Sequence, residues 1–77
     1  MKELLEVIAR ELVDKPDEVI VTQTEGEKGV VLELRVAQED MGKVIGKQGK
    51  IAKAIRTVIR AAAIHNNQHI SVAIVQQ

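Results

Sequence analysis

A chain of 77 residues without cysteine must fold around one apolar core, because it can form neither a disulfide nor a cysteine-ligated metal site. It has no Phe, Tyr or Trp, which argues against nucleic-acid-binding folds that stack bases on these rings. The net charge is zero, but all 11 acidic residues lie at or before Asp40, so residues 1–40 carry −6 and the rest +6. This asymmetry indicates either a surface that faces a polyanion or attraction between the two parts of the chain.

Residues 1–77 are expected to form one domain. No apolar run approaches the ~20 residues of a membrane span. The N-terminal residues carry acids through their apolar stretch and lack the apolar region of a secretory signal. We therefore expect a soluble, cytoplasmic protein with no membrane span.

An amphipathic helix is predicted over residues 2–13, and Pro16 ends it because the residue before proline avoids helical geometry. Its apolar stripe contains Leu4, Leu5, Ile8 and Leu12. Two strands follow, over residues 18–25 and 30–37, joined by a turn that contains Gly26 and Gly29. The second strand alternates, so one face should be covered and the other solvated. Its inward side chains are predicted to be Val30, Leu32, Leu34 and Val36.

Residues 41–60 contain both a glycine-bounded corner and a run of positive charges. A short helical turn, opened by Glu39 and Asp40, leads into the corner Gly46-Lys47-Gln48-Gly49 and then into a helix over residues 50–64. Every charge in the stretch is positive: Lys43, Lys47, Lys50, Lys53, Arg56 and Arg60. Cations disfavour the start of an isolated helix, but they are expected where the helix N-terminus binds a phosphate. The alternative is a flexible corner that is basic only because it is solvated.

The helix over residues 50–64 divides into an apolar and a basic side. Its apolar stripe contains Ile51, Ala52, Ile55, Val58, Ile59 and Ala62. Ile64 projects among the basic residues, so either it lies at a frayed helix end or another chain buries it.

Residues 65–69 are predicted to form a polar loop, and residues 70–75 a last strand with Ile70, Val72 and Ile74 on one face. His65 and His69 have a spacing that could bind a metal on a helix, but no Asp, Glu or Cys follows them. We expect no metal and no cofactor. The element order is α-β-β-α-α-β, with the last two helices as a crossover that makes strands two and three parallel. The fold class is therefore α+β, a three-stranded mixed sheet backed by three helices.

This order, together with the residues from Val44 to Ile51, VIGKQGKI, resembles the type II KH domain of the KhpA-type small bacterial RNA-binding proteins. The resemblance covers essentially the whole chain. It implies a groove for about four nucleotides of single-stranded RNA. The helix pair and the corner would form one wall, and the last strand with the loop before it the other. The implied RNA-binding residues are Lys43, Val44, Ile45, Gly46, Lys47, Gln48, Gly49, Lys50, Ile51 and Lys53.

Residue chemistry suggests a role for each part of this set. Gly46 and Gly49 would let the backbone approach phosphates, because glycine has no Cβ. Lys47 and Lys50 would supply charge, and Gln48 an adaptable hydrogen-bonding group. Val44, Ile45 and Ile51, with Ala52 and Ile55, would form an aliphatic platform beneath the bases; for Ile55 a place in the core is the better reading. Asp at both glycines is expected to abolish RNA binding and to leave the fold largely intact.

The competing function is a protein-interaction module whose basic helix docks on an acidic partner. An enzyme is not expected, because Ser71 is the only serine and nothing pairs a nucleophile with a base. The resemblance also implies a homodimer, or a heterodimer with a KhpB-type KH protein. A dimer would raise avidity by joining two weak grooves, and the sequence places its contact at Ile64.

Overall fold

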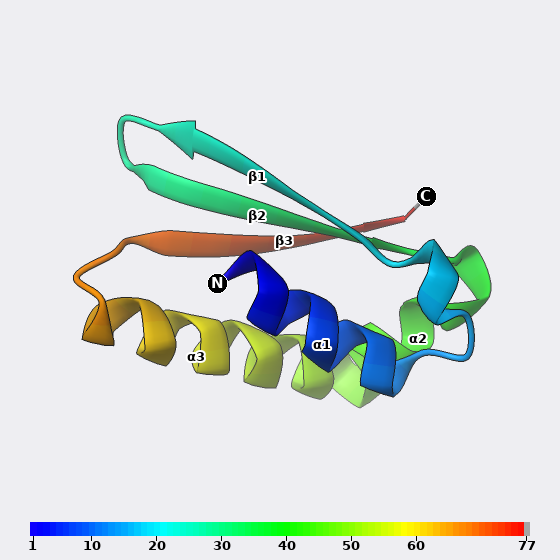
Figure 1. Cartoon of the computed structure of the whole chain (residues 1–77). Coiled ribbons are helices and arrows are strands. Elements are labelled where there is room, and N and C mark those ends of the chain that lie inside the picture. Colours follow the sequence, from blue (N-terminus) through cyan, green and yellow to red (C-terminus); the bar gives the residue numbers. More distant parts are fainter. Residues whose placement is uncertain (77) are drawn as a thin grey trace.

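The protein has two layers, a three-stranded sheet on one side and the helices on the other (Figure 1). The structure is a computed structural model that describes residues 1–76. Its helices and strands are α1 (Lys2–Leu12), β1 (Ile20–Gly26), β2 (Gly29–Val36), α2 (Met41–Ile45), α3 (Lys50–His65) and β3 (Ile70–Gln76). Three short 3-10 turns complete it: η1 (Pro16–Glu18), η2 (Gln38–Asp40) and η3 (Lys47–Gly49). The predicted α+β class and element order are confirmed.

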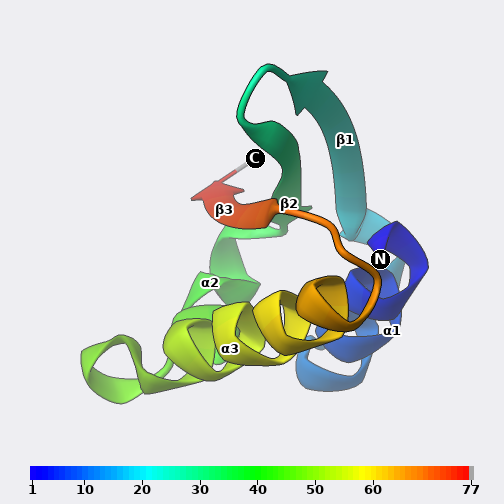
Figure 2. The same cartoon turned by 90° about the vertical axis from the view of Figure 1, so that its left-hand side faces the viewer.

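The strands lie in the order β1-β2-β3, with β1 antiparallel and β3 parallel to β2. The parallel pair follows from the crossover through α2 and α3. In the end-on view, β3 and α2 lie on one side of the molecule, and β1 and α1 on the other (Figure 2). This arrangement leaves the outer edge of β3 beside α2 and α3.

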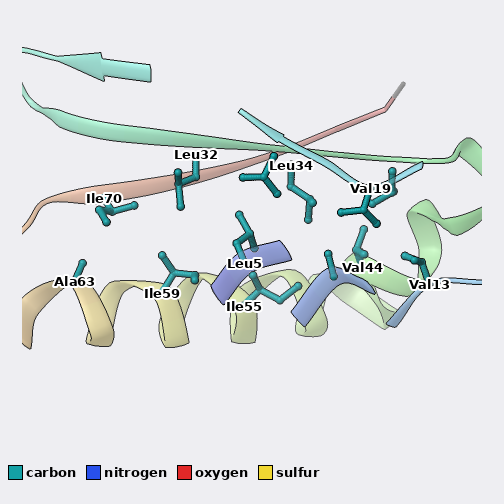
Figure 3. Packing of buried hydrophobic residues seen from close by; sticks show 13 residues of the cluster. Leu5, Val13, Val19, Leu32, Leu34, Val44, Ile55, Ile59, Ala63 and Ile70 are labelled. Carbon is teal, nitrogen blue, oxygen red and sulfur yellow. The ribbon is translucent and has the colours of Figure 1, made fainter. Parts of the chain in front are cut away.

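The core lies between β2 and the two long helices (Figure 3). The predicted inner face of β2 is confirmed: Leu32, Leu34 and Val36 are fully buried, and Val30 is partly buried against the core. Leu5 of α1 and Ile59 of α3 close this core from the helical side.

The helix faces differ in part from the predicted stripes. Ala9 and Ala63, which the stripes omit, are buried, whereas Leu4 and Val58 are 37% and 48% exposed. The predicted apolar stripes of the two long helices cover a wider surface than the part of each helix that packs against the sheet. Leu4 and Val58 line an apolar groove between α1 and α3 that is open to solvent.

The first strand begins later than predicted, at Ile20 instead of Glu18. Pro16 starts a 3-10 turn here, closed by the N–H of Glu18, which donates to the carbonyl of Lys15 at 3.0 Å. Proline favours this geometry because its ring holds φ near the helical value. Among the helices that the structure describes, none is long and apolar enough to cross a membrane.

Candidate nucleic-acid interface

The corner between α2 and α3 projects from the side of the molecule that carries β3 (Figure 2). Gly46 has φ 76° and ψ 176°, a region that is essentially restricted to glycine. A Cβ at Gly46 would also lie 2.5 Å from Cγ1 of Ile51. Gly49 is left-handed as well, with φ 74°, but a Cβ there would meet open space. Gly46 is therefore required by the fold, and Gly49 mainly by backbone conformation.

Gln48, between the glycines, also has a positive φ of 58°. For a residue with a side chain this conformation costs roughly 1–2 kcal/mol. Such strain persists only where the surroundings enforce it, and it concentrates at functional sites. The exposed Gln48 side chain stands at the tip of the corner, free to contact a ligand.

The start of α3 is strongly basic. No side chain caps the helix, and its first turn contains no acid. The first N–H groups of a helix have no acceptor within the helix, and the helix dipole favours a negative charge beside them. Exposed Lys47, Lys50 and Lys53 surround this end, and none of them forms an ion pair in residues 1–76. The N–H of Lys50 donates to the carbonyl of Lys47 in the preceding turn, so a phosphate placed here would meet mainly the lysines and the positive end of the helix dipole.

Lys43 is the exception among the predicted cations. It forms an ion pair with Asp14, and its Nζ lies 4.0 Å from Oδ1 of Asp40. The hydrogen bond to Asp14 raises the pKa of Lys43 above its usual value. Its charge is thus already compensated on the side of the molecule that faces α1.

The predicted aliphatic residues lie at different depths. Val44 is fully buried, and Ile55 is 3% exposed, in agreement with its reading as a core residue. Ile45 and Ile51 are partly exposed and pack against the core. Ile51 also lines the apolar groove between α1 and α3. Ile45 and Ile51 are thus accessible from the surface, whereas Val44 is not.

Two further residues shape the site. Nε of Arg56 donates to the carbonyl of Val72 at 3.2 Å and so joins α3 to the outer edge of β3. The carboxylate of Asp40 is buried, and it accepts from the N–H groups of Asp14 (3.2 Å) and Lys15 (3.0 Å). The basic helix face pointed to Arg56 as a cation but not to its contact with β3, and nothing in the sequence distinguishes Asp40 as an anchor.

The described part of the chain contains no cluster of three or more His, Cys, Asp and Glu that could hold a metal ion.

A family model of the KH domain of KhpA and KhpB matches residues 2–74. The chain belongs to the KhpA/KhpB KH-domain family.

Relatives within the KhpA/KhpB family match over nearly their full length. RNA-binding protein KhpA of Clostridium acetobutylicum is 64% identical over 75 residues, which cover 97% of this chain and 100% of the relative. RNA-binding protein KhpA of Clostridium perfringens is 61% identical with the same coverage. The protein of that name from Borreliella burgdorferi is 51% identical over 72 residues, 94% of this chain and 88% of the relative. The resemblance drawn from the GKQG corner and the element order is thereby confirmed.

Proposed function

We propose that the protein binds about four nucleotides of single-stranded RNA in a groove between the corner and the outer edge of β3. The observation that carries this proposal is the start of α3, which has no side-chain cap and no acid in its first turn and is surrounded by exposed cations that form no ion pair within residues 1–76. The KhpA/KhpB relatives that are named RNA-binding proteins support it.

Each residue at the corner would have its own role in RNA binding. Gly46 and Gly49 keep the backbone free of Cβ atoms where phosphates approach. Lys47, Lys50 and Lys53 neutralise phosphates, and Gln48 donates or accepts hydrogen bonds. Ile45 contacts the bases, and Ile51, which also lines the groove between α1 and α3, supports it together with Val44. Lys43 contributes only weakly because Asp14 holds it.

Fluorescence polarisation with a labelled single-stranded RNA, measured over a range of salt concentrations, tests this function. If about four phosphates are neutralised, log K should fall with log salt at a slope of about −3. Lys47→Gln with Lys50→Gln should weaken binding and make the slope shallower by roughly 1.4. The matched control, Lys2→Gln with Lys28→Gln, removes two cations away from the corner and should change neither quantity. A slope near zero, or equal displacement by an acidic peptide, would favour the protein-docking module instead.

We also propose that a second copy of the chain covers the apolar groove between α1 and α3. The groove encloses about 550 Å³ and is lined by Leu4, Ile8, Ile51, Ala54, Ile55 and Val58, with Lys50 at its rim. A two-fold axis along it would set α1 of one copy on α3 of the other. A self-complementary apolar face of this kind suits an isologous dimer. Contact at Ile64 and pairing with a KhpB-type protein both remain predictions.

A further inference from the structure

β1 forms one edge of the sheet, and within residues 1–76 only β2 pairs with it. It lies on the side of the molecule that carries α1 (Figure 2). All its residues except Val21 are exposed. A strand of seven residues extends about 24 Å, so the free edge of β1 is long enough to pair with a whole strand of another chain.

The hairpin register shows which backbone groups of β1 face outward. The residues on either side of the two-residue loop pair with each other and share both hydrogen bonds, and bonded pairs then alternate along the hairpin. By this alternation the N–H and carbonyl groups of Val21, Gln23 and Glu25 point away from β2. No hydrogen bond joins these groups to another element in residues 1–76. The free edge therefore offers a row of backbone donors and acceptors.

β1 lacks most of the features by which proteins keep an edge strand from pairing. It contains no Pro and no Lys, and its register with β2 runs from Ile20 to Gly26 without a bulge. Its middle residues, from Thr22 to Thr24, are uncharged, and threonine favours an extended backbone. The only charge within the strand is Glu25, near its end. The backbone thus permits a further strand, and charge decides which one.

Acidic residues flank the free edge at both ends. Asp17 lies just before β1, and Glu25 and Glu27 lie at its end; all three are exposed, and none forms an ion pair within residues 1–76. Lys28 is the only cation in residues 17–28. A second copy paired through the same edge, in either direction, would set acids against acids, which is unfavourable. A basic segment would instead meet opposite charge at both ends.

We propose that the free edge of β1 binds an extended basic segment of a partner protein as a fourth strand of the sheet. In such strand addition, main-chain hydrogen bonds supply affinity and side chains supply specificity. The segment spans about seven residues, with Lys or Arg at both ends and β-branched residues between them. Because β3 and α2 lie on the opposite side of the molecule, RNA at the corner and the segment at β1 can bind at the same time.

The probe is a labelled synthetic peptide in which threonine and valine alternate between a pair of lysines at each end. Fluorescence polarisation measures its affinity, and amide hydrogen exchange followed by NMR locates its site. The peptide should slow exchange at Val21, Gln23 and Glu25, whose N–H groups gain acceptors, and change it little at Thr22 and Thr24, which β2 already protects. The same peptide with glutamate in place of lysine should bind at least about fivefold more weakly.

Two sets of variants test the backbone and the charge separately. Gln23→Pro removes an outward donor at a position where an edge strand tolerates proline. It should lower affinity for the lysine peptide at least about fivefold, whereas Gln23→Ala, its matched control, should bind nearly as the wild-type protein does. Glu25→Gln with Glu27→Gln should weaken binding at least about twofold, and this loss should shrink as salt is added. The control, Glu3→Gln with Glu11→Gln, removes two acids of α1 and should leave the affinity unchanged.

Several results would overturn the inference. Failure of the lysine peptide to bind, or equal binding of the glutamate peptide, would contradict a free edge selected by charge. Protection from exchange on α3 or β3 instead of β1 would place the basic segment elsewhere. Loss of self-association in a folded Gln23→Pro, seen by sedimentation without peptide, would make the edge an interface between copies. The charge variants and the exchange measurement decide the matter even where Gln23→Pro destabilises the fold.

Discussion

Gly46 and Gly49 occupy the two ends of one corner for different physical reasons. Gly46 combines a backbone conformation that other residues avoid with the side chain of Ile51 where a Cβ would lie. Gly49 has only the backbone requirement, because the space beside it is open. Asp at both glycines therefore does not separate a lost RNA contact from a damaged fold.

Single alanine substitutions should separate the two roles. Gly49→Ala should lower the free energy of unfolding by about 1–2 kcal/mol, the cost of a left-handed residue with a side chain. Gly46→Ala should lower it further, because Ile51 must also move. Urea unfolding followed by far-ultraviolet circular dichroism measures both, since the chain lacks Trp and Tyr fluorescence.

The urea unfolding of Gly49→Ala is also the reference for a variant that places a negative charge at the corner. Gly49→Asp should be at least as stable in urea as Gly49→Ala, because the helix dipole and the lysines favour a carboxylate at this helix start. It should nevertheless bind RNA much more weakly, since the carboxylate repels phosphate. Equal RNA affinity of the two variants would show that the corner does not contact phosphates.

At the scale of elements, the position of α2 depends on the connection between α1 and β1. The buried carboxylate of Asp40, just before α2, binds the backbone at Asp14 and Lys15. Glu39 beside it pairs with Lys15 at the surface, and the hydrogen bond from Lys15 lowers the pKa of Glu39. The stabilisation from that pair is fully present at pH values above the usual pKa of a glutamate carboxyl. It is lost as the pH falls through the lowered pKa of Glu39. Both partners are exposed, so the pair contributes little.

Asp40→Ala should lower the free energy of unfolding by about 1.5–3 kcal/mol, because two backbone donors lose a charged acceptor. It should also weaken RNA binding, since the start of α2 and the corner behind it lose their anchor. Glu39→Gln, one residue away, is the control and should cost much less than Asp40→Ala, because its ion pair with Lys15 is exposed. Equal stability of the two variants in urea would contradict the anchoring role of Asp40.

The parts of the fold that could be predicted depend on local patterns. The alternation in β2 and the crossover between β2 and β3 follow from spacing and chain order, and both are confirmed. The anchor at Asp40 could not be predicted, because its partners are 25 and 26 residues away and are backbone groups of any residue type. The contact between Arg56 and Val72 likewise depends on how α3 packs beside β3. The exposure of Leu4 and Val58 depends on how α1 and α3 pack together, which leaves the groove that both residues line open to solvent.

At the scale of the whole molecule, the structure separates the two explanations of the charge asymmetry. Among the six cations after Asp40, only Lys43 forms an ion pair with an acid in residues 1–76. The other ion pairs join residues within the acidic part, such as Lys15 with Glu39 and Arg35 with Glu33. Attraction between the two parts therefore accounts for Lys43 alone. The remaining cations face solvent, as expected of a surface for a polyanion.

Self-association can be tested with two exposed aliphatic residues of nearly equal exposure. Val58, 48% exposed, lies in the α1–α3 groove, and Ile20, 49% exposed, lies on β1. The wild-type protein should sediment as a dimer at micromolar concentration without RNA, and Val58→Asp should sediment as a monomer because it places a charge in the apolar contact. Ile20→Asp should remain a dimer.

Ile64→Asp, at a residue 66% exposed, tests the other surface in the same experiment. If Ile64→Asp sediments as a monomer and Val58→Asp as a dimer, the interface lies at the end of α3 and not in the α1–α3 groove. A wild-type mass of 8.5 kDa at all concentrations would rule out the homodimer.

The contact between Arg56 and Val72 has a consequence for the free protein. β3 is the last strand of the sheet, and a strand with an open edge can recruit the edge strand of another molecule, which is a route to aggregation. The guanidinium of Arg56 occupies one of the carbonyls that such an intruding strand would need. Arg56 thus protects the edge while the groove is empty, and RNA lying along the same edge would extend that protection.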